Sequence, residues 1–232
     1  MMEPRDRIIV ALDVPSVDDA MRLVSKLKGS VGVYKIGLEL LFNGGFQLAR
    51  ELADKGLNVF IDAKLLDIEA TVERATATIA KGGAKFLTVH ATDRKTLDAA
   101  VRGRGNGPLK LLGVTVLTNL TTADLAEQGS SMPPLALVQR RADLARDAGF
   151  DGVVASGREA AALRERLGGE FLIVTPGIRS RGPSVDDQAR AVTPSEAIKA
   201  GANYIVVGRP ITRAADPRQA AEAIAAEIAG AS

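Results

Sequence analysis

The sequence contains no cysteine and no tryptophan, and aromatic residues make up only 3% of its 232 residues. The absence of cysteine excludes disulfide bonds and thiolate metal sites, and it suits the reducing cytoplasm, where we expect this protein to work. The shortage of aromatic side chains removes the stacking platform that single-stranded nucleic acids use. Because 30 basic residues nearly cancel 28 acidic ones, there is no strong basic face, and we do not expect nucleic acid as a partner.

Long hydrophobic runs are also missing. No stretch approaches the roughly 20 consecutive apolar residues that a helix needs to cross a bilayer. Residues 1–7 lack the apolar core of a signal peptide. We therefore expect no membrane partner, although hydrophobic residues still make up 46% of the chain, enough for a large core.

Short apolar runs alternate with longer amphipathic stretches along the whole chain. The runs are flanked by glycine or charged residues, which favours strands over buried helices, and their continuous apolar character is typical of parallel strands covered on both faces. The length is close to the roughly 250 residues of a (β/α)8 barrel. We predict an α/β fold, a (β/α)8 TIM barrel formed by residues 1–232 as one domain. The predicted strands are residues 8–12, 33–36, 59–64, 86–89, 111–117, 152–155, 171–175 and 204–207.

Local signals agree with this alternation. Ser16 is predicted to cap the first helix and Asp216 the last, and another helix is predicted from Glu69 to Lys81. Two connections are long for this fold, residues 119–134 and 177–194, and both follow strand carboxyl ends, where barrel active sites lie. We predict that they are lids or binding loops. An open doubly wound sheet would instead require a glycine-rich loop after the first strand, where the chain reads Asp-Val-Pro-Ser.

Polar side chains recur at the predicted carboxyl ends of the strands. A structural protein would gain little from charges at successive strand ends that face one mouth, so we predict a catalytic or binding site there. His90, the only histidine, has no second metal ligand nearby in the sequence and is predicted to be a packed or hydrogen-bonded side chain. The set is Asp13, Lys35, Asp62, Lys64, His90, Thr118 and Arg209.

The most informative segment is Asp62-Ala63-Lys64-Leu65-Leu66-Asp67. Side chains two residues apart share a face of a strand, so Asp62 and Lys64 are predicted to point into the mouth and Ala63 away from it. Neighbouring carboxylates favour the charged form of a lysine, which suits an acid or an electrostatic stabiliser rather than a Schiff-base nucleophile. A simple ion pair at a strand end is the alternative interpretation.

Two glycine-containing turns predict a phosphate site. Gly208 lets backbone amides approach a ligand after the eighth strand, and the guanidinium of Arg209 can grip a phosphate. Residues 175–179, Thr-Pro-Gly-Ile-Arg, open a polar loop that contains Gln188. Phosphate sites made by the loops after strands seven and eight recur in this fold, so we predict that the loop closes over a phosphate. The alternative is that Gly208 merely ends a strand.

Together these segments resemble the orotidine 5′-monophosphate decarboxylase family, in that family's order and over nearly the whole chain. The resemblance implies decarboxylation of orotidine 5′-monophosphate to uridine 5′-monophosphate in pyrimidine nucleotide synthesis, without a metal or other cofactor. The matching segments are Ala11-Leu12-Asp13, Tyr34-Lys35-Ile36-Gly37, Asp62-x-Lys64-x-x-Asp67-Ile68, Thr175-Pro176-Gly177-Ile178-Arg179, Asp187-Gln188 and Val207-Gly208-Arg209.

The resemblance also implies a role for each matching residue. Lys64 would donate the proton to C6 of the pyrimidine, and the site would be shared across a homodimer, with Asp67 and Thr71 coming from the partner subunit. The implied catalytic charge array is Lys35, Asp62, Lys64 and Asp67. The implied substrate-binding residues are Asp13, Lys35 and Thr71 at the ribose, Thr118 at the pyrimidine edge, Pro176 and Ile68 in the pocket, Gln188, Gly208 and Arg209 at the phosphate, and Arg179 at the base of the lid.

The chain departs from the family pattern at Glu69-Ala70, where Pro or Asp followed by Asn is expected, and this departure concerns the implied subunit contacts. Two other interpretations stay open. A metal-dependent sugar-phosphate decarboxylase or lyase of the same superfamily shares the Asp-x-Lys-x-x-Asp segment, but it needs more carboxylate ligands, and Lys35 argues against a cation there. A non-catalytic nucleotide-binding barrel would gain little from burying Asp62, Lys64 and Asp67.

Overall fold

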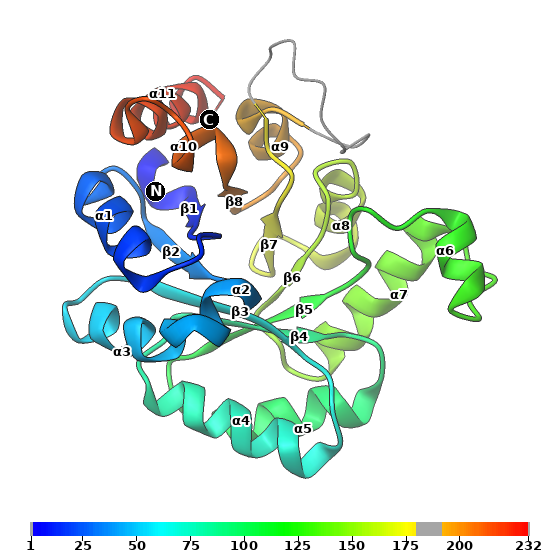
Figure 1. Cartoon of the computed structure of the whole chain (residues 1–232). Helices are drawn as coiled ribbons and strands as arrows, with labels where there is room; N and C mark the ends of the chain where they lie inside the picture. Colours follow the sequence, from blue (N-terminus) through cyan, green and yellow to red (C-terminus); the bar gives the residue numbers. More distant parts are fainter. Residues whose placement is uncertain (1, 180–191, 232) are drawn as a thin grey trace.

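A computed structural model describes residues 2–179 and 192–231, and it confirms the predicted (β/α)8 barrel (Figure 1). The strands pair in parallel in chain order, and the barrel closes because β1 pairs with β8 as well as with β2. The strands are β1 (Ile8–Ala11), β2 (Val33–Ile36), β3 (Val59–Leu65), β4 (Phe86–His90), β5 (Lys110–Val114), β6 (Gly152–Val154), β7 (Leu172–Thr175) and β8 (Tyr204–Val207).

Helices lie around the outside of the strands, and α11 packs beside the first turn, η1, so that the two ends of the described chain are close together (Figure 1). Among the described residues, none of the helices is long and apolar enough to cross a membrane. The helical segments are η1 (Pro4–Arg7), α1 (Val17–Leu27), α2 (Leu38–Leu40), η2 (Leu41–Gly45), α3 (Phe46–Asp54), α4 (Glu69–Lys81), α5 (Arg94–Arg104), α6 (Thr122–Glu127), α7 (Pro134–Asp147), α8 (Ala160–Leu167), α9 (Pro194–Lys199), α10 (Arg209–Thr212) and α11 (Pro217–Ala229).

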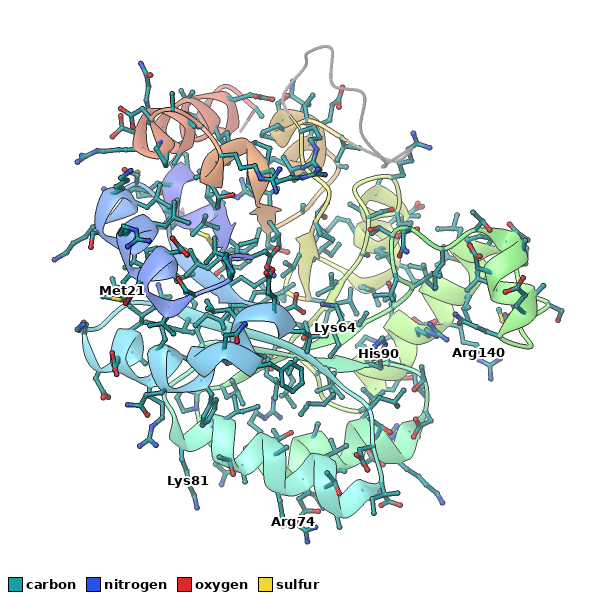
Figure 2. The ribbon with its side chains drawn as sticks, in the orientation of Figure 1. Met21, Lys64, Arg74, Lys81, His90 and Arg140 are labelled. Atoms are coloured by element: carbon teal, nitrogen blue, oxygen red, sulfur yellow. The ribbon has the colours of Figure 1, made fainter. Side chains whose placement is uncertain are left out.

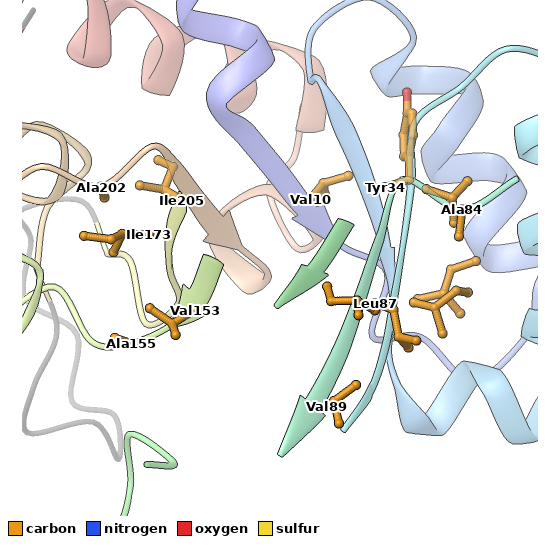
Figure 3. Close-up of a cluster of buried hydrophobic side chains, with 14 of the residues drawn as sticks. Val10, Tyr34, Ala84, Leu87, Val89, Val153, Ala155, Ile173, Ala202 and Ile205 are labelled. Carbon is orange, nitrogen blue, oxygen red and sulfur yellow. The ribbon is translucent and has the colours of Figure 1, made fainter. Parts of the chain in front are cut away.

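Strand side chains alternate between two apolar clusters. One set, which includes Val10, Leu87 and Ile205, packs with helix residues outside the barrel (Figure 3). The other set fills the barrel interior and consists of Ile9, Val33, Phe60, Phe86, Leu112, Val174 and Tyr204. Because both faces of each strand are covered, the strands are apolar nearly throughout, as the sequence pattern predicted.

The predicted helix boundaries are confirmed where capping residues mark them. The Ser16 hydroxyl accepts a hydrogen bond from the Asp19 amide at the start of α1, and Asp216 caps α11. Helix α4 begins at Glu69, as predicted, and the Glu69 carboxylate lies 3.5 Å from the guanidinium of Arg102 on α5. The glutamate that departs from the family pattern thus joins two neighbouring helices.

Two sequence predictions, about β5 and the connection that follows it, need correction. Strand β5 ends at Val114 rather than at residue 117, because the Thr115 hydroxyl donates to the Val154 carbonyl and the chain then turns. The connection 119–134 is not a plain loop, since a reciprocal cap between Thr121 and Asp124 starts α6. Elsewhere, the helical segment after β2 is divided into α2, η2 and α3, because Asn43 and Gly44 have non-helical backbone angles. Of the connection 177–194, residues 180–191 lie outside the described residues, and its described ends meet in a β-bridge between Ile178 and Val192.

Candidate active site

A cavity of about 430 Å³ opens at the carboxyl ends of the strands. Apolar side chains such as Phe60, Val154 and Val206 form part of its wall, and most of the residues predicted from the sequence form the rest. The structure therefore brings together predicted residues from six separate segments of the chain. Those that line the cavity are Asp13, Lys35, Asp62, Lys64, Thr118, Pro176, Arg179, Gly208 and Arg209.

The remaining predicted residues do not line this cavity. Asp67 and Ile68 follow β3 and are exposed, with 73% of Ile68 accessible to solvent. Thr71 lies on α4 and borders a separate apolar groove with Leu41 and Phe46. Gln188 lies outside the described residues. Within a single chain, the structure does not bring Asp67, Ile68 and Thr71 into the cavity.

Charges of alternating sign run along one wall of the cavity. The Lys35 ammonium lies 3.0 Å from Asp13 Oδ1 and 3.3 Å from Asp62 Oδ2, and Lys64 Nζ lies 2.9 Å from Asp62 Oδ1. Lys35 is buried, whereas the Lys64 side chain at the end of the series keeps 31% of its surface exposed. Figure 2 shows Lys64 near the centre of the barrel. We call Asp13, Lys35, Asp62 and Lys64 the charge array.

Burial opposes charge on the inner members of the array, and their neighbours outweigh it. Burial alone would raise the pKa of the Asp62 carboxyl, but Lys35, Lys64 and a hydrogen bond from Thr88 bring that pKa below its usual range. Burial would likewise lower the pKa of Lys35, yet Asp62 and Asp13 raise it above the ordinary value. Both groups are therefore charged at neutral pH, and each depends on the other for its charge.

Gly37 lies close against this array. A β-carbon at Gly37 would lie 3.0 Å from Asp13 Oδ1 and 3.1 Å from Lys35 Nζ. Such contacts are tighter than most β-carbons make, so the Asp13 carboxylate and the Lys35 ammonium would have to shift by a few tenths of an ångström to admit a larger residue. The glycine in the Tyr-Lys-Ile-Gly segment thus leaves room for Lys35 to reach Asp13.

The backbone at Lys64 is irregular. The pairing of β3 with β4 shifts register between Ile61 and Leu65, and Lys64 has φ of +48°, a region that L-residues other than glycine seldom adopt. The predicted faces are confirmed, since Asp62 and Lys64 line the cavity and Ala63 packs on the outer core. The regular alternation behind that prediction, however, is interrupted here.

Thr88 on β4 accompanies this irregularity, and the sequence analysis missed it. The Lys64 amide donates to Thr88 Oγ1 at 3.0 Å, and the Thr88 hydroxyl donates to Asp62 Oδ1 at 2.9 Å. A signal was present in the sequence, because Thr88 stands two residues before His90 and therefore shares its face of β4. A hydroxyl at an otherwise apolar inward position needs a partner.

His90 ends β4 and is partly buried near Lys64 (Figure 2). Burial lowers the pKa of its imidazole, and the nearby positive charges of Arg141 and Lys64 lower it further. The imidazole is therefore neutral at neutral pH. No group of three or more His, Cys, Asp or Glu side chains that could hold a metal ion occurs within the described ranges.

Another part of the cavity carries groups suited to an anion. Arg209 follows β8 and Arg179 follows β7, so two guanidinium groups from the segments after neighbouring strands border the same space. A methyl group on Gly208 would meet only Ala11 Cβ, at 3.7 Å, so the cavity is open beside this residue. Guanidinium groups and backbone amides at a strand end can donate hydrogen bonds to phosphate oxygens.

Three comparisons relate the chain to known proteins. The sequence profile of the family described as "Orotidine 5'-phosphate decarboxylase / HUMPS family" matches residues 6–224. The orotidine 5'-phosphate decarboxylase of Rhodopseudomonas palustris is 52% identical over 225 residues, which cover 97% of this chain and 95% of that protein. The Methylobacterium radiotolerans protein of the same name is 51% identical over 227 residues, 98% of each chain.

Among solved structures, the crystal structure of orotidine 5'-phosphate decarboxylase from Lactobacillus acidophilus superposes with a TM-score of 0.84 at 37% sequence identity. The match covers 95% of this chain and 98% of that one. Fold and sequence therefore point to the same group of proteins.

Proposed function

The chain belongs to the orotidine 5'-phosphate decarboxylase / HUMPS family, and from that premise we propose that it converts orotidine 5′-monophosphate to uridine 5′-monophosphate and CO2 in cytoplasmic pyrimidine synthesis. The observation that carries the proposal is the charge array on the wall of a cavity that Arg179 and Arg209 also line. We further propose that residues 1–232 act as one domain, which the extent of the family match supports.

The difficulty of this reaction is the carbanion that it creates. When the bond between C6 and its carboxylate breaks, CO2 leaves and the electron pair stays on C6, in the ring plane, where the π system cannot delocalise it. The ammonium of Lys64, held beside C6, would stabilise this charge as it develops and then donate a proton to C6. The product is uridine 5′-monophosphate, and the neutral amine regains its proton from solvent.

Asp62 contributes mainly by holding Lys64. Its Oδ1 lies 2.9 Å from Lys64 Nζ, so the ammonium is directed before the substrate arrives. Preorganised charge of this kind is commonly the largest single contribution to catalysis. Repulsion between Asp62 and the leaving carboxylate could add to the rate, but we give it less weight than the fixed ammonium.

The rest of the cavity would hold the nucleotide. Asp13 and Lys35 would bind the ribose hydroxyls from one side of the array. Thr118 would read the pyrimidine edge, and Pro176 would pack on the pocket wall. The phosphate would lie against Arg209 and the Gly208 amide, with Gln188 as a further ligand and Arg179 at the base of the closing loop.

We propose that the site is completed by a second copy of the chain. Asp67, Ile68 and Thr71 would enter the partner's cavity, where Asp67 would extend the array beyond Lys64. Support comes from apolar side chains exposed after β2 and β3, which include Leu38, Phe42, Leu66 and Ile68. Exposed large apolar side chains occur at interaction surfaces, and Phe42, with 86% of its surface exposed, is the most accessible of these four.

The subunit arrangement can be tested by mixing two inactive variants. If the site is shared, Asp67→Ala and Lys64→Ala proteins should regain activity after subunit exchange, because one of the two sites in each mixed dimer keeps both residues. Each variant exchanged with itself is the matched control. No recovery after confirmed exchange would remove Asp67 from the partner's site.

The decarboxylation itself can be tested by following the loss of orotate absorbance with purified protein, with and without EDTA, and identifying the product. We expect turnover that is indifferent to the chelator, in keeping with a reaction that needs no metal or organic cofactor. Lys35 supports this expectation, because its buried ammonium sits between Asp13 and Asp62, where a cation would otherwise bind. Loss of activity in EDTA and its return with magnesium would favour the metal-dependent alternative, and no turnover at all would overturn the proposal.

A further inference from the structure

Thr88 is a fully buried residue of β4 whose hydroxyl bonds to two members of the charge array, the Lys64 amide and the Asp62 carboxylate. Its hydroxyl has one proton to donate. A backbone amide can only donate and a carboxylate can only accept, so the directions of the two bonds are fixed: Lys64 N–H donates to Thr88, and Thr88 donates to Asp62. One hydroxyl therefore links the backbone of one residue to the side chain of the other.

The bond to the Lys64 amide lies where the regular ladder fails. Between Ile61 and Leu65 the register of β3 on β4 shifts, and within this stretch the Lys64 amide donates to a side-chain oxygen. Lys64 also has its positive φ at this point. A strained backbone conformation persists only where its surroundings hold it, and the Thr88 hydroxyl is a contact that does so directly.

The bond to Asp62 acts on the carboxylate that directs the Lys64 ammonium. Asp62 Oδ1 accepts from the Thr88 hydroxyl at 2.9 Å and lies 2.9 Å from Lys64 Nζ, while Oδ2 faces Lys35. The hydroxyl thus fixes the rotation of the carboxylate group, and with it the point to which Lys64 Nζ is drawn. The backbone and the side chain of Lys64 are both positioned through Thr88.

We infer that Thr88 is a positioning residue for the proposed decarboxylation, one that sets the place of the Lys64 ammonium without touching the substrate. The inference rests on the proposed function. It assigns to a buried hydroxyl a role that an apolar side chain of equal size cannot fill. Valine at this position should therefore preserve the packing but no longer hold the Lys64 ammonium in place.

The test compares Thr88→Val, Thr88→Ser and Thr76→Val in the decarboxylation assay. Thr76 is a buried threonine on α4 whose hydroxyl has no hydrogen-bond partner among the described residues, so Thr76→Val controls for the substitution itself. We expect Thr88→Val to lower kcat by about tenfold to a hundredfold, as small misplacements of reacting groups do, with a KM change smaller than the change in kcat. Thr88→Ser, which keeps the hydroxyl, and Thr76→Val should stay near wild type.

The pH profile separates positioning from general damage. Lys35 from β2 and Lys64 from β3 favour the charged form of Asp62 against its burial, the Thr88 hydrogen bond adds to their effect, and His90 from β4 also faces this group. Removing the hydroxyl raises the pKa of Asp62, so activity should be lost at a higher pH on the acid side in Thr88→Val than in wild type or Thr88→Ser. If Thr88→Val fails to fold by thermal melting, Thr88→Ala makes the same comparison with a smaller side chain.

Wild-type kcat in Thr88→Val, or equal loss in Thr88→Ser, would overturn the positioning role while leaving the proposed function intact. An equal shift of the acid limb in Thr88→Ser and Thr88→Val would do the same, because it would show that the hydroxyl is not its cause. If the wild-type protein itself does not consume orotidine 5′-monophosphate, the proposed function fails and the inference fails with it.

Discussion

The barrel interior is filled in two different ways at two successive levels of the same strands. Along β2, Val33 is followed two residues later by Lys35, and along β3, Phe60 is followed by Asp62. The lower level consists of apolar side chains such as Val33 and Phe60. There the Phe86 ring packs edge to face against Phe60 and Tyr204, with ring centroids 5.8 Å and 5.3 Å apart. The upper level instead holds the charge array.

The two levels differ in their effect on folding stability and in whether one chain completes them. Burying the apolar side chains of the lower level stabilises the folded protein, and the residues of one chain close this level. Burying a charge destabilises the folded protein unless the charge is paired, and the array of the upper level ends at Lys64, which remains partly exposed. The comparison teaches that the lower level supplies stability, whereas the upper level sacrifices some stability for chemistry.

The sharpest way to break this comparison is to remove the ammonium at the end of the array. Under the proposed mechanism, Lys64→Ala should lower turnover by at least about a thousandfold, or roughly 4 kcal/mol in the barrier, because it would remove both the stabilising charge and the proton source. The free energy of unfolding should change far less than the barrier. Steady-state kinetics beside urea unfolding would measure both, and a variant that kept a tenth of wild-type turnover would remove Lys64 from the mechanism.

Much of this arrangement could be predicted from the sequence, because side chains two residues apart share a face of a strand. That period correctly placed Asp62 and Lys64 toward the cavity, and the alternation of short apolar runs with amphipathic stretches predicted the barrel. It could not show the positive φ of Lys64 or the role of Thr88, because both arise where β3 loses register with β4. Helix α6 was missed for a different reason: its cap, Thr121 with Asp124, is a readable signal that lay within an expected loop.

In contrast to Lys64→Ala, a truncation in the lower level is expected to reduce stability and to leave turnover nearly unchanged. Phe86→Ala should reduce the free energy of unfolding by about 3–5 kcal/mol, because it leaves a cavity between two aromatic rings. At temperatures where the variant is folded, its kcat should stay close to wild type, since Phe86 does not line the active-site cavity. Phe86→Leu, with a smaller loss, is the matched variant if Phe86→Ala does not fold. A thousandfold loss of kcat in folded protein would contradict the separation of the two levels.

Within the upper level, the phosphate end can be separated from the charge array by changing the substrate. Arg209→Ala should lower kcat/KM for orotidine 5′-monophosphate by about a hundredfold, or roughly 2.7 kcal/mol, because a charged partner of the phosphate is lost. The same variant should hardly affect the much slower reaction of orotidine, which has no phosphate. Equal losses with both substrates would make Arg209 a structural residue and place the phosphate elsewhere.

The smallest expected effect concerns the irregular backbone at Lys64. Glycine is normally less stable than alanine in a regular element, by about 0.5–1 kcal/mol. At a positive φ the order should reverse, because a β-carbon in the left-handed region costs roughly 1–2 kcal/mol. Since Lys64 has φ of +48°, Lys64→Gly should be more stable to urea than Lys64→Ala, by about 1 kcal/mol. The missing ammonium is common to both variants and cancels in the comparison.

Lys26, exposed on α1, is the control position, where the alanine variant should be more stable than the glycine variant. If alanine were also the more stable residue at position 64, the backbone there would carry no strain, and the Thr88 hydroxyl would have nothing to hold.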